Sequence, residues 1–403
     1  MRIAYLSYEF PPDIASGGIG TYTYQVTKAL KKQSGIELEI FSGSSARSIS
    51  NEKLDDGIII HRILTKTREE FRNDVIPVLL HRHSQNNFDI IESPEYGAEG
   101  LNIKQVINNI PLVVKLHTPS FLVKEINRSL KRHQLKYRFK NYLGLGVYKK
   151  EKDAEYLLTK LADAVSSPSS SLVGIIQEKW RIPLNSISII PNSFVPANYF
   201  LKIPIHTRTN YITYIGRLEG RKGVHLLADA IPGVLRTVPD ARIRFIGRTN
   251  IGPGGRGTML DFLKMKLSQY SDRIEFIDHV PLSDIPLWLE KTDICVFNSL
   301  WENFPNVCLE AMSAGRGIVA SKNGGMYEML HDIHGGELVN PYNPIEIESA
   351  LIKLLQNPDE RMAMGDRCRN KVIEFYAKKV PDLNLQFYQS IIDQYKKQKL
   401  HLI

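Results

Sequence analysis

Cysteine and long apolar runs are both scarce in this sequence. The 403 residues include three cysteines, Cys295, Cys308 and Cys368, and none belongs to a Cys-x-x-Cys pair. A disulfide framework or a cysteine-ligated zinc site is therefore not expected. No apolar stretch approaches the ~20 residues of a membrane-spanning helix, and the amino terminus reads as a buried strand rather than a signal peptide. We expect a cytoplasmic protein that does not cross the bilayer.

Acidic residues are sparse in one segment. Between residues 124 and 152, ten Lys or Arg face only Glu125 and Glu151, and this segment supplies much of the net charge of +9. Apolar side chains are interspersed, so an anionic membrane surface or a phosphorylated acceptor would fit here. A solvated helical face fits equally well. Nucleic acid is not an expected partner, because no recognised binding module accompanies the charge.

Short β-branched runs alternate with amphipathic segments of helical length, a pattern that predicts an α/β fold with parallel sheets between helices. The predicted strands cover residues 2–7, 38–42, 58–63, 90–92, 112–117, 164–166, 187–190, 211–218, 241–246, 274–277, 294–298 and 317–321. The predicted helices include residues 21–33, 172–180 and 223–236.

The length of the chain predicts two domains, because each half is long enough to bury a core. Prolines and polar residues over 192–209 indicate a linker. We expect one domain over 1–195, a second over 205–375, and a helix over 376–403 that packs back on the first domain. Ligands of open α/β sheets bind beyond the carboxyl ends of the strands, so two sheets that face each other would share one cleft.

Two glycine-containing loops follow predicted strands and precede helices. The first contains Gly17 and Gly18, where a diphosphate could approach the backbone and the helix amino terminus. Its spacing does not match a NAD fingerprint, and a turn without a ligand is the alternative. The second runs from Gly216 to Gly223 and carries Arg217 and Lys222, a guanidinium fork and a point charge suited to a pyrophosphate. Solvated turn residues are the alternative there.

A pair of glutamates follows the strand predicted to end at residue 298. Pro305 suits the start of a helix, so Glu302 should precede this helix and Glu310 should lie within it. Free amides near Asn306 and Val307 would point at a phosphate or at sugar hydroxyls. Ionised carboxylates accept hydrogen bonds from vicinal diols. Ordinary helix capping is the alternative for this pair.

Together these segments resemble the family 4 retaining glycosyltransferases of the GT-B fold, over nearly the whole chain. The resemblance is carried by Gly17-Gly18, Gly216-Arg217-Leu218 with Lys222-Gly223, Glu302 and Glu310 in a Glu-x7-Glu spacing, residues 311–315, and Gly324-Gly325. It implies two Rossmann-like domains that face each other across a cleft, with the acceptor on the first and the nucleotide-sugar donor on the second. It also implies transfer of a hexose to a saccharide or lipid-linked acceptor in the synthesis of cell-surface polysaccharides or glycoconjugates.

The resemblance implies a role for each matching position. Arg217 and Lys222 would hold the donor diphosphate, aided by backbone amides at Gly17 and Gly18 and near Asn306 and Val307. Glu310 would accept hydrogen bonds from the ribose, Glu302 would bind the transferred sugar, His117 would lie near that sugar and its phosphate, and Val280 would belong to the donor site. No metal or cofactor is expected, because the sequence has no Asp-x-Asp triplet of the kind that metal-dependent glycosyltransferases use.

Other functions stay open from the sequence. The same fold serves sugar phosphorylases and sucrose-type synthases, which products formed with free sugar acceptors would distinguish. A nucleotide-sugar binding protein without turnover is the non-enzymatic alternative, although the presence of Arg217, Lys222, Glu302 and Glu310 argues against it.

Overall fold

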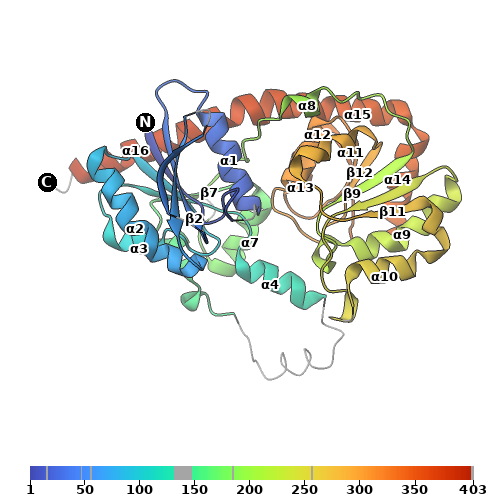
Figure 1. Ribbon diagram of the computed structural model, residues 1–403, viewed down its shortest axis with the longest axis horizontal. Coiled ribbons are helices and arrows are strands. Elements are labelled where there is room, and N and C mark those ends of the chain that lie inside the picture. Colours follow the sequence, from blue (N-terminus) through green and yellow to red (C-terminus); the bar gives the residue numbers. More distant parts are fainter. Residues whose placement is uncertain are drawn as a thin grey trace. The chain divides into compact units, whose positions relative to one another are not determined.

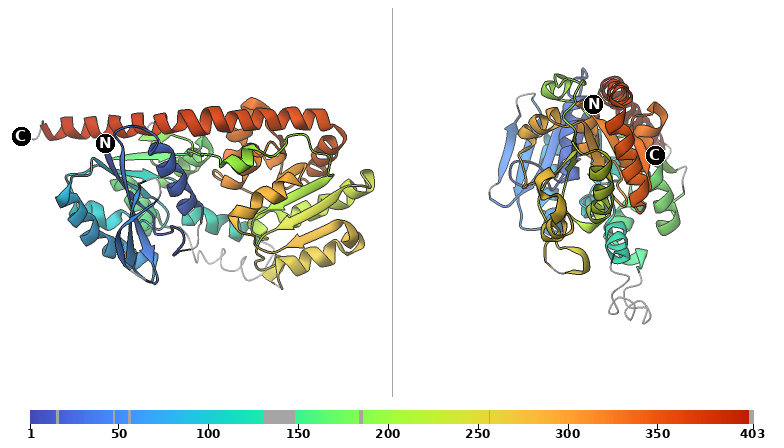
Figure 2. Two further views of the ribbon diagram at one scale, coloured as in Figure 1. Left: turned by 45° about the horizontal axis from the view of Figure 1, so that its top comes forward. Right: turned by 90° about the vertical axis from the view of Figure 1, so that its right-hand side faces the viewer.

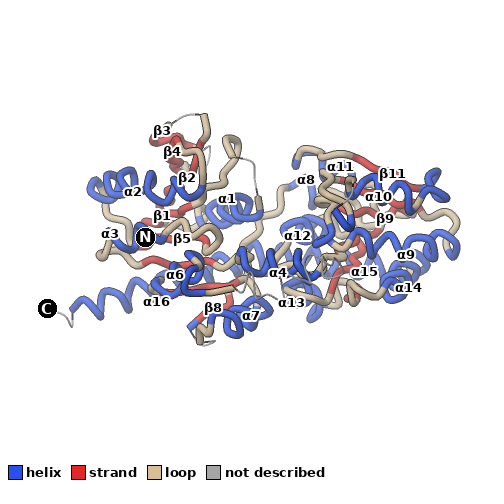
Figure 3. The backbone as a smooth tube through the Cα atoms, turned by 90° about the horizontal axis from the view of Figure 1, so that it is seen from below, coloured by secondary structure: helices blue, strands red, loops and turns tan. Residues whose placement is uncertain are grey.

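The computed structural model describes residues 1–14, 17–46, 48–54, 57–130, 148–183, 186–255 and 257–400. The chain divides into two compact units. The first comprises Met1–Leu122, Tyr148–Val195 and Tyr376–Ile403, and the second comprises Val123–Val147 and Pro196–Phe375. Each unit has its own sheet with helices around it, visible as two sets of red strands among blue helices in Figure 3.

The first unit is built on an eight-stranded sheet, whose strand order is β3-β4-β2-β1-β5-β6-β7-β8. Its strands are β1 (Arg2–Leu6), β2 (Glu37–Ser44), β3 (Ile49–Lys53), β4 (Ile59–Leu64), β5 (Ile90–Pro94), β6 (Leu112–Lys115), β7 (Ala164–Ser167) and β8 (Ile187–Ile189). All neighbouring strands pair in parallel except β3, which is antiparallel to β4 at the edge. The sheet order reverses between β1 and β5, which is where open α/β sheets bind ligands.

Helices cover both faces of this sheet, as Figure 1 shows. They are α1 (Gly18–Leu30), α2 (Arg68–Gln85), α3 (Leu101–Val106), α6 (Ala154–Leu161), α7 (Ser170–Trp180) and α16 (Val380–Leu400). The chain passes from the first unit to the second within a further helix, α4 (Ser120–Ser129). Helix α16 packs against α1, and both are visible in Figure 2. Tyr388 of α16 is buried in the core of this unit and donates a hydrogen bond to Glu92 of β5 over 2.5 Å.

The second unit has a six-stranded, entirely parallel sheet in the order β11-β10-β9-β12-β13-β14. Its strands are β9 (Tyr211–Ile215), β10 (Arg242–Ile246), β11 (Ile274–Ile277), β12 (Ile294–Phe297), β13 (Gly317–Ser321) and β14 (Glu337–Val339). Its helices are α8 (Asn198–Leu201), α9 (Val224–Thr237), α10 (Met259–Lys266), α11 (Ile285–Glu290), α12 (Asn306–Ser313), α13 (Gly325–Leu330), α14 (Pro344–Gln356) and α15 (Pro358–Lys371). The apolar face of α9 packs with α14 and the strands in one core.

Every strand predicted from the sequence is present, with ends that differ by a few residues. The strand predicted over 211–218 ends at Ile215, because Gly216 takes a φ of +150° that strands do not adopt. The helix predicted over 21–33 begins at Gly18, so Gly17 caps it. Strands β3 and β14 were not predicted from the sequence, since both are short edge strands without a run of apolar residues.

The linker predicted over residues 192–209 is partly a fixed element of the second unit. Arg316 donates to the Thr207 hydroxyl over 3.1 Å, and Arg361 donates to the Thr207 carbonyl over 2.7 Å. Arg369 donates to the carbonyl of Ile203 over 2.7 Å. Residues 203–207 are therefore fastened to the second unit, because buried guanidinium groups must keep hydrogen-bond acceptors.

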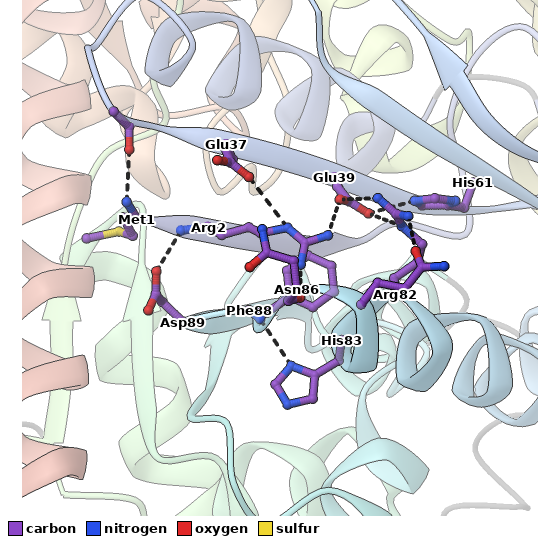
Figure 4. A network of polar contacts seen from close by, with 12 residues as sticks. Met1, Arg2, Glu37, Glu39, His61, Arg82, His83, Asn86, Phe88 and Asp89 are labelled. Atoms are coloured by element: carbon purple, nitrogen blue, oxygen red, sulfur yellow. Dashed lines mark hydrogen bonds and ion pairs between the residues drawn. The ribbon is translucent and has the colours of Figure 1, made fainter.

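A buried ionic network joins four elements, β1, β2, β4 and α2, at the amino end of the first sheet (Figure 4). Glu39 of β2 accepts hydrogen bonds from Arg2 of β1, from Arg82 of α2 at 2.9 and 3.0 Å, and shares one with the His61 ring at 2.7 Å. Burial alone would raise the pKa of Glu39, but these three partners lower it to about 2. The network lies at the edge opposite to the carboxyl ends of the strands, so its role is structural.

We expect Glu39→Gln to lower the free energy of unfolding by about 3 kcal/mol at pH 7, and by much less near pH 2. A lowered folded-state pKa stabilises the fold above the unfolded pKa of about 4.5, and this contribution disappears as the pH falls through about 2. Urea unfolding at pH 7 and pH 2.5 measures the difference. Glu37→Gln is the matched control, because the Glu37 side chain is 67% exposed and lies 3.7 Å from the same arginine. An equal loss in both variants would contradict the assignment.

Among the described residues, no helix combines the length and the apolar character that crossing a membrane requires. The basic segment over 124–152 has its central part, residues 131–147, outside the described residues.

Candidate functional site

The loops after β9 and β12 meet at the point where the strand order of the second sheet reverses. These two strands are neighbours in the sheet, although 78 residues separate Ile215 from Ile294 along the chain. Because both strands are parallel, their carboxyl ends lie at one edge. The loop with Arg217 and Lys222 therefore adjoins the loop with Glu302.

Glu302 is the ionic centre of this edge. Its Oε1 atom accepts a hydrogen bond from the Lys222 ammonium at 2.5 Å and from the Arg221 guanidinium at 2.7 Å. The side chains of all three residues are less than one-fifth exposed. Burial opposes ionisation of Glu302, but the two cations outweigh burial and hold its pKa below the usual value. In the described part of the chain, no donor contacts the other oxygen, Oε2.

Two glycines allow this approach of separate loops. Gly223 has a φ of +68°, and a β-carbon there would clash with the carbonyl oxygen of Asn298, just beyond β12. Gly324 has a φ of +88°, and a β-carbon there would clash with the backbone of Glu302. The next amide, that of Gly325, donates to the Glu302 carbonyl over 2.9 Å. The backbone of Glu302 is thus held by the loop after β13, while its carboxylate is held by the loop after β9.

Arg217 is placed differently from Lys222. Its side chain is 60% exposed, and its guanidinium lies 3.5 Å from Glu219. Glu219 also accepts hydrogen bonds from Arg221 at 2.9 Å and from Asn250 at 2.8 Å. Arg217 and Lys222 share one loop as predicted, but they contact different carboxylates.

Helix α12 carries the second predicted glutamate. It begins at Asn306, after Glu302, and no side chain caps its first turn, because Pro305 holds the capping position. The amides of Asn306 and Val307 therefore belong to an uncapped amino end that favours negative charge. Glu310 lies within the helix, and no described residue donates a hydrogen bond to its carboxylate. Burial without a partner raises the pKa of Glu310 to about 7.

Val280 lies three residues beyond β11 and is half-buried. It stands at the same edge of the second sheet as the glutamates, since β11 is parallel to β10 and β9. The side chain of Val280 is apolar, so it cannot form a hydrogen bond or an ion pair with a ligand.

Gly17 and Gly18 belong to the first unit. Gly17 precedes α1, and a β-carbon on it would clash with the carboxylate of Glu9. Arg68 at the start of α2 pairs with Glu9 and with the buried Glu99. The glycine loop is therefore adjacent to a carboxylate whose charge an arginine compensates.

His117 also belongs to the first unit, two residues beyond β6. Its backbone N–H donates to the Glu95 carboxylate over 2.7 Å, and its ring meets the edge of Tyr22 at 5.0 Å between centroids. Burial, reinforced by Lys115 and Arg68, lowers the pKa of His117 to about 3. The imidazole is therefore neutral at physiological pH.

The second unit thus brings Lys222 and Glu302 together. The uncapped amino end of α12 follows Glu302 along the chain, and Glu310 lies within that helix. Arg221 is the member of this cluster that the sequence analysis missed. Its position beside Lys222, two residues after Glu219, was the available signal. Within the described residues, no three His, Cys, Asp or Glu side chains form a cluster able to hold a metal ion.

Two family models together match residues 16–371 of the chain. The profile described as Glycosyltransferase Family 4 matches residues 16–197, and Glycosyl transferases group 1 matches residues 197–371. A D-inositol 3-phosphate glycosyltransferase of Pseudarthrobacter chlorophenolicus is 23% identical over an alignment that covers 98% of this chain and 96% of that protein.

Solved structures share the fold. Sucrose-phosphate synthase from Thermosynechococcus elongatus superposes with a TM-score of 0.73 at 17% identity, covering 98% of this chain and 99% of that one. The Anabaena protein HepE in complex with UDP-glucose superposes with a TM-score of 0.67 at 15% identity, covering 97% of this chain and all of the other, 100%.

Proposed function

The chain belongs to the family 4 glycosyltransferases of the GT-B fold, and from this premise we propose that it transfers a hexose from a nucleotide diphosphate sugar to a saccharide or lipid-linked saccharide acceptor. The observation that carries the proposal is the cluster of Lys222, Arg221 and Glu302 at the switch point of the second sheet. Such a cluster combines cations for a diphosphate with a carboxylate for sugar hydroxyls.

Each residue has a chemical task in this proposal. Lys222 and Arg217 stabilise the charge that develops on the leaving diphosphate, and the uncapped amides at Asn306 and Val307 add to that stabilisation. Glu302 accepts hydrogen bonds from the ring hydroxyls of the transferred sugar through its open Oε2. Glu310, whose carboxylate has no donor among the described residues, accepts hydrogen bonds from the ribose.

The proposed reaction retains the configuration at the anomeric carbon. The bond from that carbon to the diphosphate oxygen breaks, the bond to the acceptor oxygen forms on the same face, and the acceptor proton passes to the departing diphosphate. The positive charge of Arg217 and Lys222 makes this departure feasible without a metal ion. The neutral ring of His117 would bind near the transferred sugar through a hydrogen bond and would not take up the proton at physiological pH.

The names of similar proteins support a polyhydroxylated acceptor. Proteins similar to this chain are named D-inositol 3-phosphate glycosyltransferase and sucrose-phosphate synthase. For this chain we propose a saccharide or lipid-linked saccharide of the cell surface. The basic segment over 124–152 would then contact the inner face of an anionic membrane from the cytoplasmic side.

A thermal-shift screen of UDP, GDP, ADP and their sugars tests this function. A ligand that binds only the folded protein raises the unfolding temperature, and at 100-fold excess over Kd the gain is about 2.7 kcal/mol. We expect one nucleotide and its sugar to give a shift of several degrees, followed by sugar transfer to a saccharide acceptor. No shift with any of them would contradict the proposal.

Glu310→Gln sharpens this test. The amide has one acceptor oxygen where the carboxylate has two, and it carries no charge, so we expect weaker hydrogen bonds from the two ribose hydroxyls and a smaller nucleotide-induced shift. The raised pKa of Glu310 means that its ionisation destabilises the folded state above the unfolded pKa of about 4.5. Without nucleotide, the variant should therefore be more stable than the wild type by roughly 2 kcal/mol at pH 8 and nearly equal at pH 4. A nucleotide shift equal to that of the wild type would contradict the ribose contact.

A further inference from the structure

Arg221 connects the two acidic side chains of the candidate donor site. One guanidinium nitrogen donates to Glu302 Oε1 at 2.7 Å, and another donates to Glu219 Oε1 at 2.9 Å. The backbone carbonyl of Arg221 accepts the N–H of Leu300 over 3.0 Å. Both the main chain and the side chain of Arg221 are therefore fixed against the loop that carries Glu302.

Lys222 and Arg221 donate to the same oxygen of Glu302. The Lys222 ammonium lies 2.5 Å from Glu302 Oε1, so without a substrate its charge is committed to Glu302. A donor diphosphate would also need that ammonium. If Lys222 were the sole partner of Glu302, its movement towards the phosphates would leave a mostly buried carboxylate unpaired, which is unfavourable.

The geometry of Arg221 removes this conflict. A guanidinium is planar and presents several donors in a fixed fork, so Arg221 holds Glu302 and Glu219 at the same time. Lysine is a point charge on a flexible stem and reorients with little loss of geometry. The two cations are thus suited to different tasks, one fixed and one mobile.

We propose that Arg221 is a positioning residue that keeps Glu302 paired and in place while Lys222 turns to the donor diphosphate. This inference rests on the proposed function, because it needs a donor with a diphosphate. It assigns to Arg221 no contact with the substrate. It also explains why Glu302 Oε2 stays open for the sugar, since both cations occupy the opposite oxygen.

Isothermal titration with UDP, GDP and ADP, and with the corresponding nucleosides, tests the proposal. For the diphosphate that the wild type binds, Arg221→Gln should weaken binding about 10-fold, because Lys222 then stays with Glu302. Binding of the nucleoside should change less than about twofold, since it does not need Lys222. Arg221→Lys should recover part of the lost affinity. The control is Arg236→Gln, which removes an equal charge from an exposed position at the far end of α9 and should change neither.

A double-mutant cycle separates this role from a general contribution to folding. In a Lys222→Met background, Arg221→Gln should change diphosphate binding less than about twofold, because the lysine through which Arg221 acts is absent. Additive losses, equal weakening of nucleoside and diphosphate, or undiminished binding by Arg221→Gln would each overturn the inference. If the wild type binds none of the three diphosphates, the proposed function fails first and the inference fails with it.

Discussion

Lys222→Met is expected to lower kcat by at least about 10²-fold while leaving the protein folded. Loss of one preorganised cation or donor at a developing negative charge typically slows turnover by this amount. The fold should survive because Arg221 still pairs with Glu302 at 2.7 Å, so no buried carboxylate is left without a partner. Initial rates with the nucleotide sugar identified by the thermal-shift screen, and a melting curve of the same sample, provide the measurement.

The control for this prediction is Lys264→Met, which removes a lysine from an exposed position on α10 in the same unit. Its rates should match those of the wild type. Full activity of Lys222→Met would exclude a role for Lys222 in stabilising the leaving group. A large decrease in the melting temperature would instead mean that the pairing of Arg221 with Glu302 is not sufficient to keep the loop after β12 in place.

Gly324→Ala should damage both stability and turnover. The backbone of Gly324 has a φ of +88°, and a β-carbon would clash with the carbonyl oxygen of Glu302. The loop after β13 must then move away from Glu302, and the hydrogen bond from the Gly325 amide to that carbonyl is strained or lost. We expect a loss of about 3 kcal/mol in the free energy of unfolding and at least about 10²-fold in kcat.

Gly35→Ala is the control that separates the effect of a steric clash from the effect of a positive φ. Gly35 has a comparable φ of +73°, but a β-carbon there would meet no atom within 4 Å, so only the conformational cost of about 1 kcal/mol applies. Its kcat should remain that of the wild type. Equal effects of the two substitutions on kcat would show that Glu302 does not depend on the loop after β13.

The α/β architecture and most strands were predictable from the sequence, because buried parallel strands are short apolar runs between amphipathic helices. The positions of Lys222, Glu302 and Glu310 were also predictable, since each lies on a loop or helix directly after a strand. Helix α12 begins after Glu302 and contains Glu310, as the sequence analysis predicted.

The partners of these residues were not predictable. The spacing does not indicate that Arg221 rather than Arg217 contacts Glu302, because Arg221 and Glu302 are 81 positions apart in the sequence. The ionic network around Glu39 likewise joins Arg2, His61 and Arg82 from separate elements. In the sequence, nothing distinguishes these residues from other polar and charged residues. The partner of a side chain depends on which strands are adjacent in the sheet. That adjacency is established only when the whole core packs.

The residue types at the carboxyl ends of the strands can be read from the amino-acid sequence, and with them the class of chemistry available to this protein. Three features emerge only in the folded chain: Lys222 and Arg221 share one oxygen of Glu302, Arg217 remains exposed, and Glu310 lacks a donor among the described residues. Local sequence sets backbone conformation and apolar pattern, whereas ionic pairing depends on distances between loops that come together only when the sheet packs.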